Sequence, residues 1–158
     1  MATPDFIHTL RASAGHQLLW IPGVTAVVLD DAGRILLGQR ADNHEWALIG
    51  GIPDPGEQPA DCAVREVYEE TAVRCVAERV VSVGASREIT YANGDICQFM
   101  DITFRCRAVD GEPRVNDDES LAVGWFALDA LPPLRDGHRF RIKQALSDEP
   151  TWFGATEG

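Results

Sequence analysis

Three glutamates, Glu66, Glu69 and Glu70, stand within five positions of one another in the segment REVYEETAV. Residues 60–71 fit a helix, and at about 100° per residue the three carboxylates fall together on one face. The small and apolar side chains of the same stretch fall on a different arc. Because like charges at such spacings destabilise an isolated helix, the cluster indicates either a solvated acidic surface or a site for a cation.

The residues around these glutamates favour the cation site. Gly50-Gly51 is followed by IPDPG, whose two prolines and glycine predict a tight loop that ends at Glu57. Arg65 stands four residues before Glu69, where its guanidinium can hold a carboxylate through paired hydrogen bonds. A rigid loop with available carbonyls, laid beside convergent carboxylates, offers the hard oxygen ligands that Mg²⁺ and Mn²⁺ prefer.

Residues 51–73 resemble the signature of the Nudix family, to which MutT-like proteins belong: G-x5-E-x7-R-E-U-x-E-E-x-G-U, where U is a bulky aliphatic residue. Every defined position matches except the second glycine, where Ala72 stands. Nudix proteins are hydrolases that use Mg²⁺ or Mn²⁺ to cleave a nucleoside diphosphate linked to another moiety. The resemblance therefore implies an enzyme that acts on diphosphate bonds in a small nucleotide substrate.

The resemblance also implies a role for each matching position. The metal ligands would be oxygen atoms of the box, from the carbonyl of Gly51 and the carboxylates of Glu66, Glu69 and Glu70. Glu57 and Arg65 would orient the loop and the glutamates. The catalytic residues would be Arg65, Glu66 and Glu69, with Glu66 as the candidate base or water-orienting group, a role whose place differs among family members.

Two residues outside the box are candidates for substrate contact. Arg40 ends a predicted strand and can reach a phosphate, or it is a strand-end charge in solvent. Glu119 lies on a loop before a strand and is either part of the site or a solvated acid. Trp46 and Tyr91 either stack on a base or serve in packing. The four histidines show no metal-ligand spacing and have no predicted role.

Ala72 departs from the family pattern at the end of the predicted helix. The glycine that it replaces would end the helix in a left-handed conformation, which costs another residue about 1 kcal/mol. We expect altered local geometry or stability with activity retained, since the carboxylates lie upstream. The alternative is a nucleotide-binding sensor of the same fold with little or no hydrolysis.

The substrate stays open between nucleoside triphosphates, oxidised ones included, and ADP-ribose-like sugar nucleotides. ADP-ribose hydrolases of the family often carry a proline after the box, and residues 86–90 contain none, which counts against that substrate. Specificity depends on loops and pocket walls outside the box.

The elements that must position these residues follow from turn chemistry and periodicity. We expect helices over 3–14 and 136–147, strands over 24–30, 34–40, 79–91, 96–109 and 121–128, and a loop over 41–58. Asn93-Gly94 predicts a hairpin, and alternation from Met100 to Ala108 predicts a half-buried strand. This order predicts one α/β domain over residues 1–158, an α/β/α sandwich with a central mixed β-sheet.

Composition limits the partners. The chain has 14 Lys and Arg against 25 Asp and Glu, a formal net charge of −11, which disfavours nucleic acid and anionic membranes. It contains no apolar run long enough to span a membrane. The four cysteines read as buried thiols of a reducing compartment, so we expect a cytoplasmic protein. The apolar stretch LLWIPG at 18–23 makes a homodimer possible.

Overall fold

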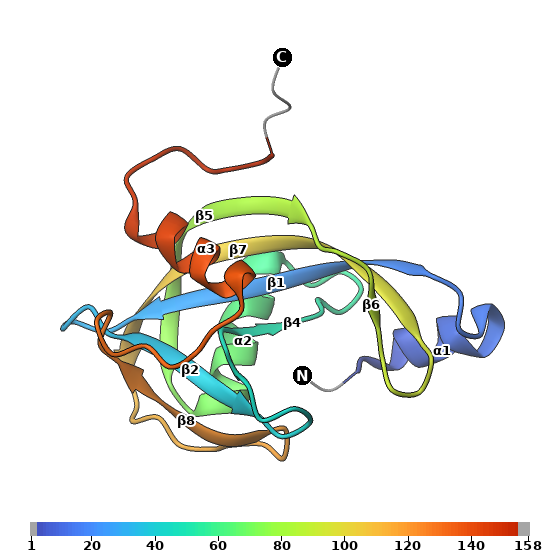
Figure 1. The fold of residues 1–158 in the computed structure, drawn as a ribbon, viewed down its shortest axis with the longest axis horizontal. Helices are drawn as coiled ribbons and strands as arrows, with labels where there is room; N and C mark the ends of the chain where they lie inside the picture. Colours follow the sequence, from blue (N-terminus) through green and yellow to red (C-terminus); the bar gives the residue numbers. More distant parts are fainter. Residues whose placement is uncertain (1–2, 155–158) are drawn as a thin grey trace.

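The computed structural model describes residues 3–154 of the protein (Figure 1). Its helices are α1 (Asp5–Ala14), α2 (Pro59–Thr71) and α3 (Asp136–Leu146). Its strands are β1 (Leu19–Leu29), β2 (Ile35–Arg40), β3 (Trp46–Ala47), β4 (Ile49–Gly51), β5 (Arg74–Ala85), β6 (Ile89–Thr90), β7 (Ile96–Asp110) and β8 (Ser120–Phe126).

The strands among these residues form one mixed sheet. Its main path runs β3-β2-β1-β7-β5, while β4 pairs with β1, β6 with β7 and β8 with β2. The pairing of β1 with β7 is parallel along the whole of β1, and the other pairings are antiparallel. The expected mixed sheet is therefore present.

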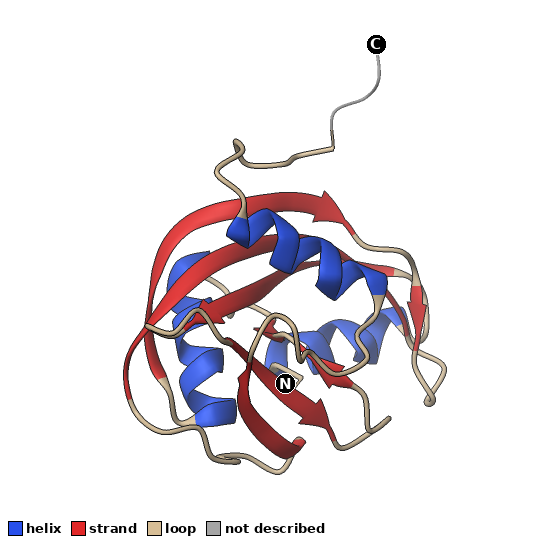
Figure 2. Cartoon of the chain, turned by 60° about the vertical axis from the view of Figure 1, so that its left-hand side comes forward, coloured by secondary structure: helices blue, strands red, loops and turns tan. Residues whose placement is uncertain are grey.

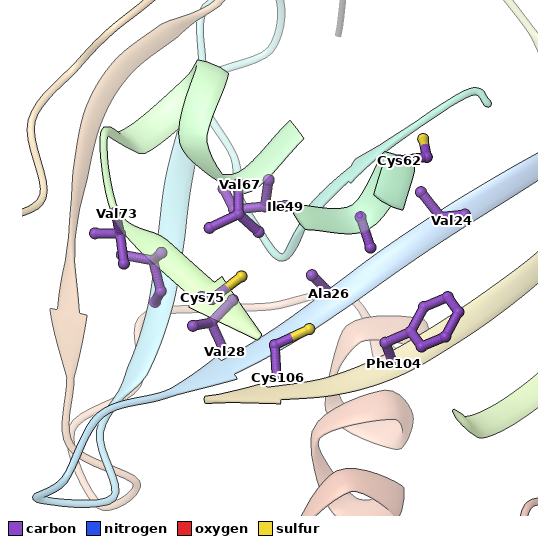
Figure 3. Close-up of a cluster of buried hydrophobic side chains, with 12 residues drawn as sticks. Val24, Ala26, Val28, Ile49, Cys62, Val67, Val73, Cys75, Phe104 and Cys106 are labelled. Carbon is purple, nitrogen blue, oxygen red and sulfur yellow. The ribbon is translucent and has the colours of Figure 1, made fainter. Parts of the chain in front are cut away.

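Strand β1 lies between two helical layers, which explains its continuous apolar sequence. Val24, Ala26 and Val28 pack with α2 in one core cluster (Figure 3). The alternate side chains Val27 and Leu29 pack with α3 in a second cluster. Because successive side chains of a strand point to opposite faces, α2 and α3 cover opposite sides of the sheet (Figure 2). The predicted α/β/α sandwich is confirmed.

The segment 41–58, expected to be a loop, contains two short strands. β4 pairs antiparallel with β1, with Gly51 opposite Val24 and Ile49 opposite Ala26. A strand of three residues, two of them glycines, carries no periodic signal, and its pairing partner lies far away in the sequence. This pairing fixes the backbone of Gly51 against α2, where it meets Glu66.

Strand β7 was expected to have one solvated face, and this expectation is wrong near its centre. Asp101 accepts hydrogen bonds from the hydroxyls of Thr25 (2.8 Å) and Thr103 (2.9 Å). Arg141 of α3 donates from Nε to the same carboxylate at 3.1 Å. Thr103 is completely buried. The polar side chains face a helix that brings its own charged partner, so alternation of polarity here does not indicate exposure.

The structure bears on the expectations about the cysteines, membrane spans and the apolar stretch 18–23. The four cysteines are unpaired and buried. None of the helices in residues 3–154 is long and apolar enough to cross a membrane. In the stretch 18–23, Leu18 and Trp20 are exposed whereas Ile21 is buried under α1. The homodimer stays a prediction.

Candidate active site

Helix α2 gives its three glutamates different surroundings. Pro59 opens the helix, where its missing N–H costs no hydrogen bond. Glu66 and Glu70, one turn apart, are both buried, although the helical wheel places them off the apolar arc. The side chain of Glu69 is 53% exposed. Burial therefore distinguishes carboxylates that look equivalent in the sequence.

Arg65 links this helix to the loop before it. Its Nε and Nη2 donate to the two oxygens of Glu57 at 2.8 and 2.9 Å, the forked geometry expected for an arginine. Its Nη1 donates to Glu66 at 3.0 Å and to Glu69 at 2.9 Å. Hydrogen bonds from Arg65 hold the pKa of Glu57 at about 2, so this carboxylate is charged at neutral pH. These hydrogen bonds are consistent with the predicted role of Glu57 and Arg65 in orienting the loop and the glutamates.

Gly51 lies in direct contact with Glu66. A Cβ atom at Gly51 would lie 2.1 Å from Oε1 of Glu66 and 2.2 Å from its Cδ, closer than real contacts allow. Only a glycine therefore lets the Glu66 carboxylate rest against this backbone. The contact brings together two of the predicted metal ligands, one from β4 and one from α2.

The loop 111–119 closes the other side of α2. The side chain of Asn116 donates to the carbonyl of Tyr68 at 3.1 Å, and its backbone N–H donates to that of Glu70 at 3.3 Å. Burial, with the nearby charges of Glu66 and Asp117, raises the pKa of Glu70 to about 7. Asp117 thus lies near enough to the acidic cluster to affect Glu70, and we did not single it out from the sequence. The acidic run DDE at 117–119 was its only signal.

The buried carboxylates fit a divalent cation in their chemistry. Burial raises the pKa of Glu66 as well as that of Glu70, and the two charges repel each other. A cation bound between hard oxygen donors would offset both the burial and the repulsion. In residues 3–154, no three or more His, Cys, Asp or Glu side chains are already grouped to hold a metal ion. In this structure Glu66 and Glu69 accept hydrogen bonds from Arg65. That Gly51, Glu66, Glu69 and Glu70 together bind a metal ion stays a prediction.

Arg40 and Glu119 are neighbours across two paired strands. Arg40 of β2 pairs with Ser120 of β8, and the backbone N–H of Ala41 donates to the carbonyl of Glu119 at 2.8 Å. The guanidinium of Arg40 binds Asp42. This bond raises the pKa of Arg40, and Glu70 contributes in the same direction through its charge. Arg40 thus lies near enough to the acidic cluster of α2 to feel the charge of Glu70, and the contact of Arg40 and Glu119 with substrate stays a prediction.

Ala72 takes up the conformation that the replaced glycine would adopt. Its φ of 60° and ψ of 8° are left-handed, and its N–H donates to the carbonyl of Tyr68 at 2.8 Å. The helix therefore ends as the family pattern requires, at the cost of a strained alanine. Trp46, the candidate for stacking, packs edge-on against Phe126, with ring centroids 4.8 Å apart.

Comparison with known proteins agrees with this geometry. The profile of the NUDIX domain matches residues 19–147. The chain belongs to the Nudix family. A MutT-like protein of Streptomyces ambofaciens is 35% identical over 124 residues, which cover 78% of this chain and 75% of the relative. This protein is a Nudix-type hydrolase, and hydrolases of this family generally use divalent metal ions.

Solved structures confirm the Nudix fold. The MutT Nudix hydrolase of Burkholderia pseudomallei is 34% identical, with a TM-score of 0.63, over 80% of this chain and 98% of that one. An ADP-ribose pyrophosphatase of Streptococcus suis is 28% identical, with a TM-score of 0.64, over 88% of this chain and 99% of that one.

Relatives differ in the substrates that their names state. A putative 8-oxo-dGTP diphosphatase of Bacillus subtilis is 28% identical over 114 residues, 72% of this chain and 71% of the relative. An NAD-capped RNA hydrolase of Pseudomonas putida is 33% identical over 95 residues, 58% of this chain but 30% of the relative. The substrates in these names are all nucleotide derivatives, but they belong to different classes.

Proposed function

We propose that this protein is a pyrophosphohydrolase that cleaves a nucleoside diphosphate linked to another moiety, with Mg²⁺ or Mn²⁺ as cofactor. The observation that carries the proposal is the cluster around Arg65, in which Glu57 braces the guanidinium and Glu66 lies against Gly51. The ion would be held by the carbonyl of Gly51 and the carboxylates of Glu66, Glu69 and Glu70. When bound, it would neutralise phosphate oxygens and make a coordinated water more acidic.

The chain's own residues prepare this chemistry. Arg65, fixed by Glu57, holds the carboxylates of Glu66 and Glu69 in place by charge-assisted hydrogen bonds. Burial raises the pKa of Glu66 towards the range that suits a general base, which supports it as the group that orients or deprotonates water. Arg40 would contact a substrate phosphate by exchanging its bond to Asp42 for one to the ligand.

Two earlier alternatives lose support. The sensor without hydrolysis depended on Ala72, and this residue reproduces the left-handed helix end. A nucleic-acid substrate is disfavoured by the net charge of −11, although three relatives are named NAD-capped RNA hydrolases and another is named an RNA pyrophosphohydrolase. We therefore propose a small nucleotide as the substrate.

The test is a substrate panel with product identification. Purified protein with Mg²⁺ or Mn²⁺ is offered nucleoside triphosphates, oxidised ones included, sugar nucleotides, ADP-ribose and NAD-capped RNA. The site of cleavage separates these classes. Glu69→Gln should lower kcat by 100-fold or more and weaken Mn²⁺ binding, whereas Asp61→Asn, exposed on the same helix, should change neither. A protein inactive on the whole panel, with Mn²⁺ binding equal in both variants, contradicts the proposal.

A further inference from the structure

A pocket of about 320 Å³ lies beside the loop that precedes α2. Its walls are Phe6 of α1, Pro22 and Gly23 of β1, Ile102 of β7 and the loop residues 53–57 together with Pro59. Its volume is at the lower end of the range for small-molecule sites, which is roughly 300–1,000 Å³. The elements that form it meet near the start of β1 (Figure 1).

This pocket adjoins the candidate metal site. Gly51 pairs with Val24, so Gly23 and Pro22 are the next residues of β1 beyond that pair. At about 3.3 Å per residue, the floor of the pocket lies within roughly 7 Å of the Gly51–Val24 pair along the strand. Glu57 lines the pocket while its carboxylate binds Arg65. A group attached to phosphates at Gly51 and Glu66 is therefore within reach of the pocket.

The lining fits a flat apolar group with hydrogen-bond donors at its edge. Phe6, Ile102 and four prolines line the pocket, and the prolines present rigid apolar surface. The ionisable residues among the described lining are Asp54 and Glu57, both acidic, which disfavours a phosphate. Glu57 already accepts from Arg65 and from the backbone N–H of Asp54. The Asp54 carboxylate makes no hydrogen bond or ion pair with residues 3–154, so it can accept one from a ligand N–H.

We infer that this pocket binds the base of the substrate nucleotide, stacked against Phe6, and that Asp54 favours a base with an amino group. The inference rests on the proposed function for the position of the phosphates. Adenine, cytosine and guanine offer an exocyclic amino group to Asp54, whereas uracil has a carbonyl oxygen in place of the cytosine amino group and only a ring N–H to donate. A sugar without a base offers no flat apolar face for Phe6.

The test measures binding of AMP, UMP and ribose 5-phosphate by calorimetry in the presence of Mg²⁺. Phe6→Ala should weaken AMP binding about 10-fold, the order of one base stacked on an aromatic ring, and leave ribose 5-phosphate unchanged. Leu10→Ala, on the exposed side of the same helix, is the control and should change neither. Phe6→Trp keeps an aromatic ring and should bind AMP as tightly as the unmodified protein. Loss of affinity in Phe6→Ala but not in Phe6→Trp would then indicate lost stacking.

Asp54 is tested separately. The unmodified protein should bind AMP several-fold more tightly than UMP, and Asp54→Ala should remove this difference. Equal AMP affinity in Phe6→Ala and Leu10→Ala, or AMP binding no tighter than that of ribose 5-phosphate, overturns the inference. In a working enzyme, an unchanged KM in Phe6→Ala refutes the pocket alone. Phe6-dependent AMP binding without any hydrolysis refutes the proposed function alone.

Discussion

The contact between Gly51 and Glu66 gives the sharpest prediction about the site. In Gly51→Ala the new methyl group would overlap the Glu66 side chain, since the three atoms nearest to its Cβ position are Oε1, Cδ and Cγ of that residue, at 2.1, 2.2 and 2.5 Å. The φ of Gly51 is not positive, so the alanine backbone itself is unstrained. The substitution therefore acts first on the Glu66 side chain.

The size of the effect follows from what Glu66 loses. Displacement breaks the 3.0 Å hydrogen bond from Arg65, a charged bond of about 1.5–3 kcal/mol. The alanine restricts the unfolded chain and returns about 0.4–1 kcal/mol. We expect Gly51→Ala to lower the free energy of unfolding by roughly 1–2 kcal/mol. Hydrolytic activity should fall about 100-fold, because a displacement of about 1 Å at a catalytic group has effects of that order.

A double-mutant cycle with urea unfolding isolates the contact. In Glu66→Ala the obstacle is absent, so adding Gly51→Ala should be neutral or stabilise by up to about 1 kcal/mol. Gly124→Ala is the matched control, because its Cβ would meet a single atom, Phe126 Cε2, at an ordinary 3.7 Å. If Gly51→Ala costs the same with and without the Glu66 side chain, the carboxylate does not lie against this glycine and the reasoning fails.

Three further changes test the helix end, the arginine and a buried histidine. Ala72→Gly should change the free energy of unfolding by less than about 1 kcal/mol in urea, because relief of left-handed strain, about 1–2 kcal/mol, is offset by chain entropy and a lost methyl contact. A larger change would refute this balance. The unmodified protein should already be active, so recovery of activity from a dead protein in Ala72→Gly would contradict that expectation. Arg65→Lys should lower the free energy of unfolding by about 1–3 kcal/mol in the same assay, because a lysine cannot make the paired hydrogen bonds to Glu57. An unchanged midpoint of urea unfolding would refute this bracing role of Arg65. Burial, with Arg141 nearby, lowers the pKa of His138 to about 4. Because the unfolded chain takes up this proton at a higher pH than the folded protein does, the free energy of unfolding should fall by on the order of 3 kcal/mol as the pH drops from about 6.5 to about 4. His138→Asn should flatten this dependence, and an equal slope in both proteins would show that another group titrates.

The sequence predicts the central features of this fold because their signals are local. Residues 23–29 of β1 are apolar apart from Thr25 and are buried on both faces. Pro59 marks the first residue of α2. Ala72 ends this helix in the left-handed conformation that was expected of the glycine it replaces, so the geometry is retained and the cost falls on stability. The hairpin at Asn93-Gly94 forms between β6 and β7, with Gly94 at a φ of 89°. At Pro59 and Gly94 the residue type itself determines which backbone conformations are available.

The features that sequence reasoning missed depend on distant contacts. β4 is a strand only because β1 pairs with it, and its Ile-Gly-Gly sequence has little intrinsic strand preference. Asp117 enters the site because Asn116 fastens its loop to the end of α2. Asp101 is shielded from solvent by Arg141, which comes from a helix 40 positions further along the chain. No local pattern reports which helix will cover a strand.

The four glutamates of the box show how one residue type acquires different properties in one site. Glu57 has a pKa of about 2 because Arg65 binds it, whereas burial raises that of Glu70 to about 7. Glu69 stays in contact with solvent, and Glu66 combines burial with a bond from Arg65. The single guanidinium offsets part of the charge on Glu57, Glu66 and Glu69, and Glu70 lies outside its hydrogen bonds. A cation entering from solvent would therefore gain most beside Glu66 and Glu70, because these two carboxylates are the buried ones and burial makes negative charge costly.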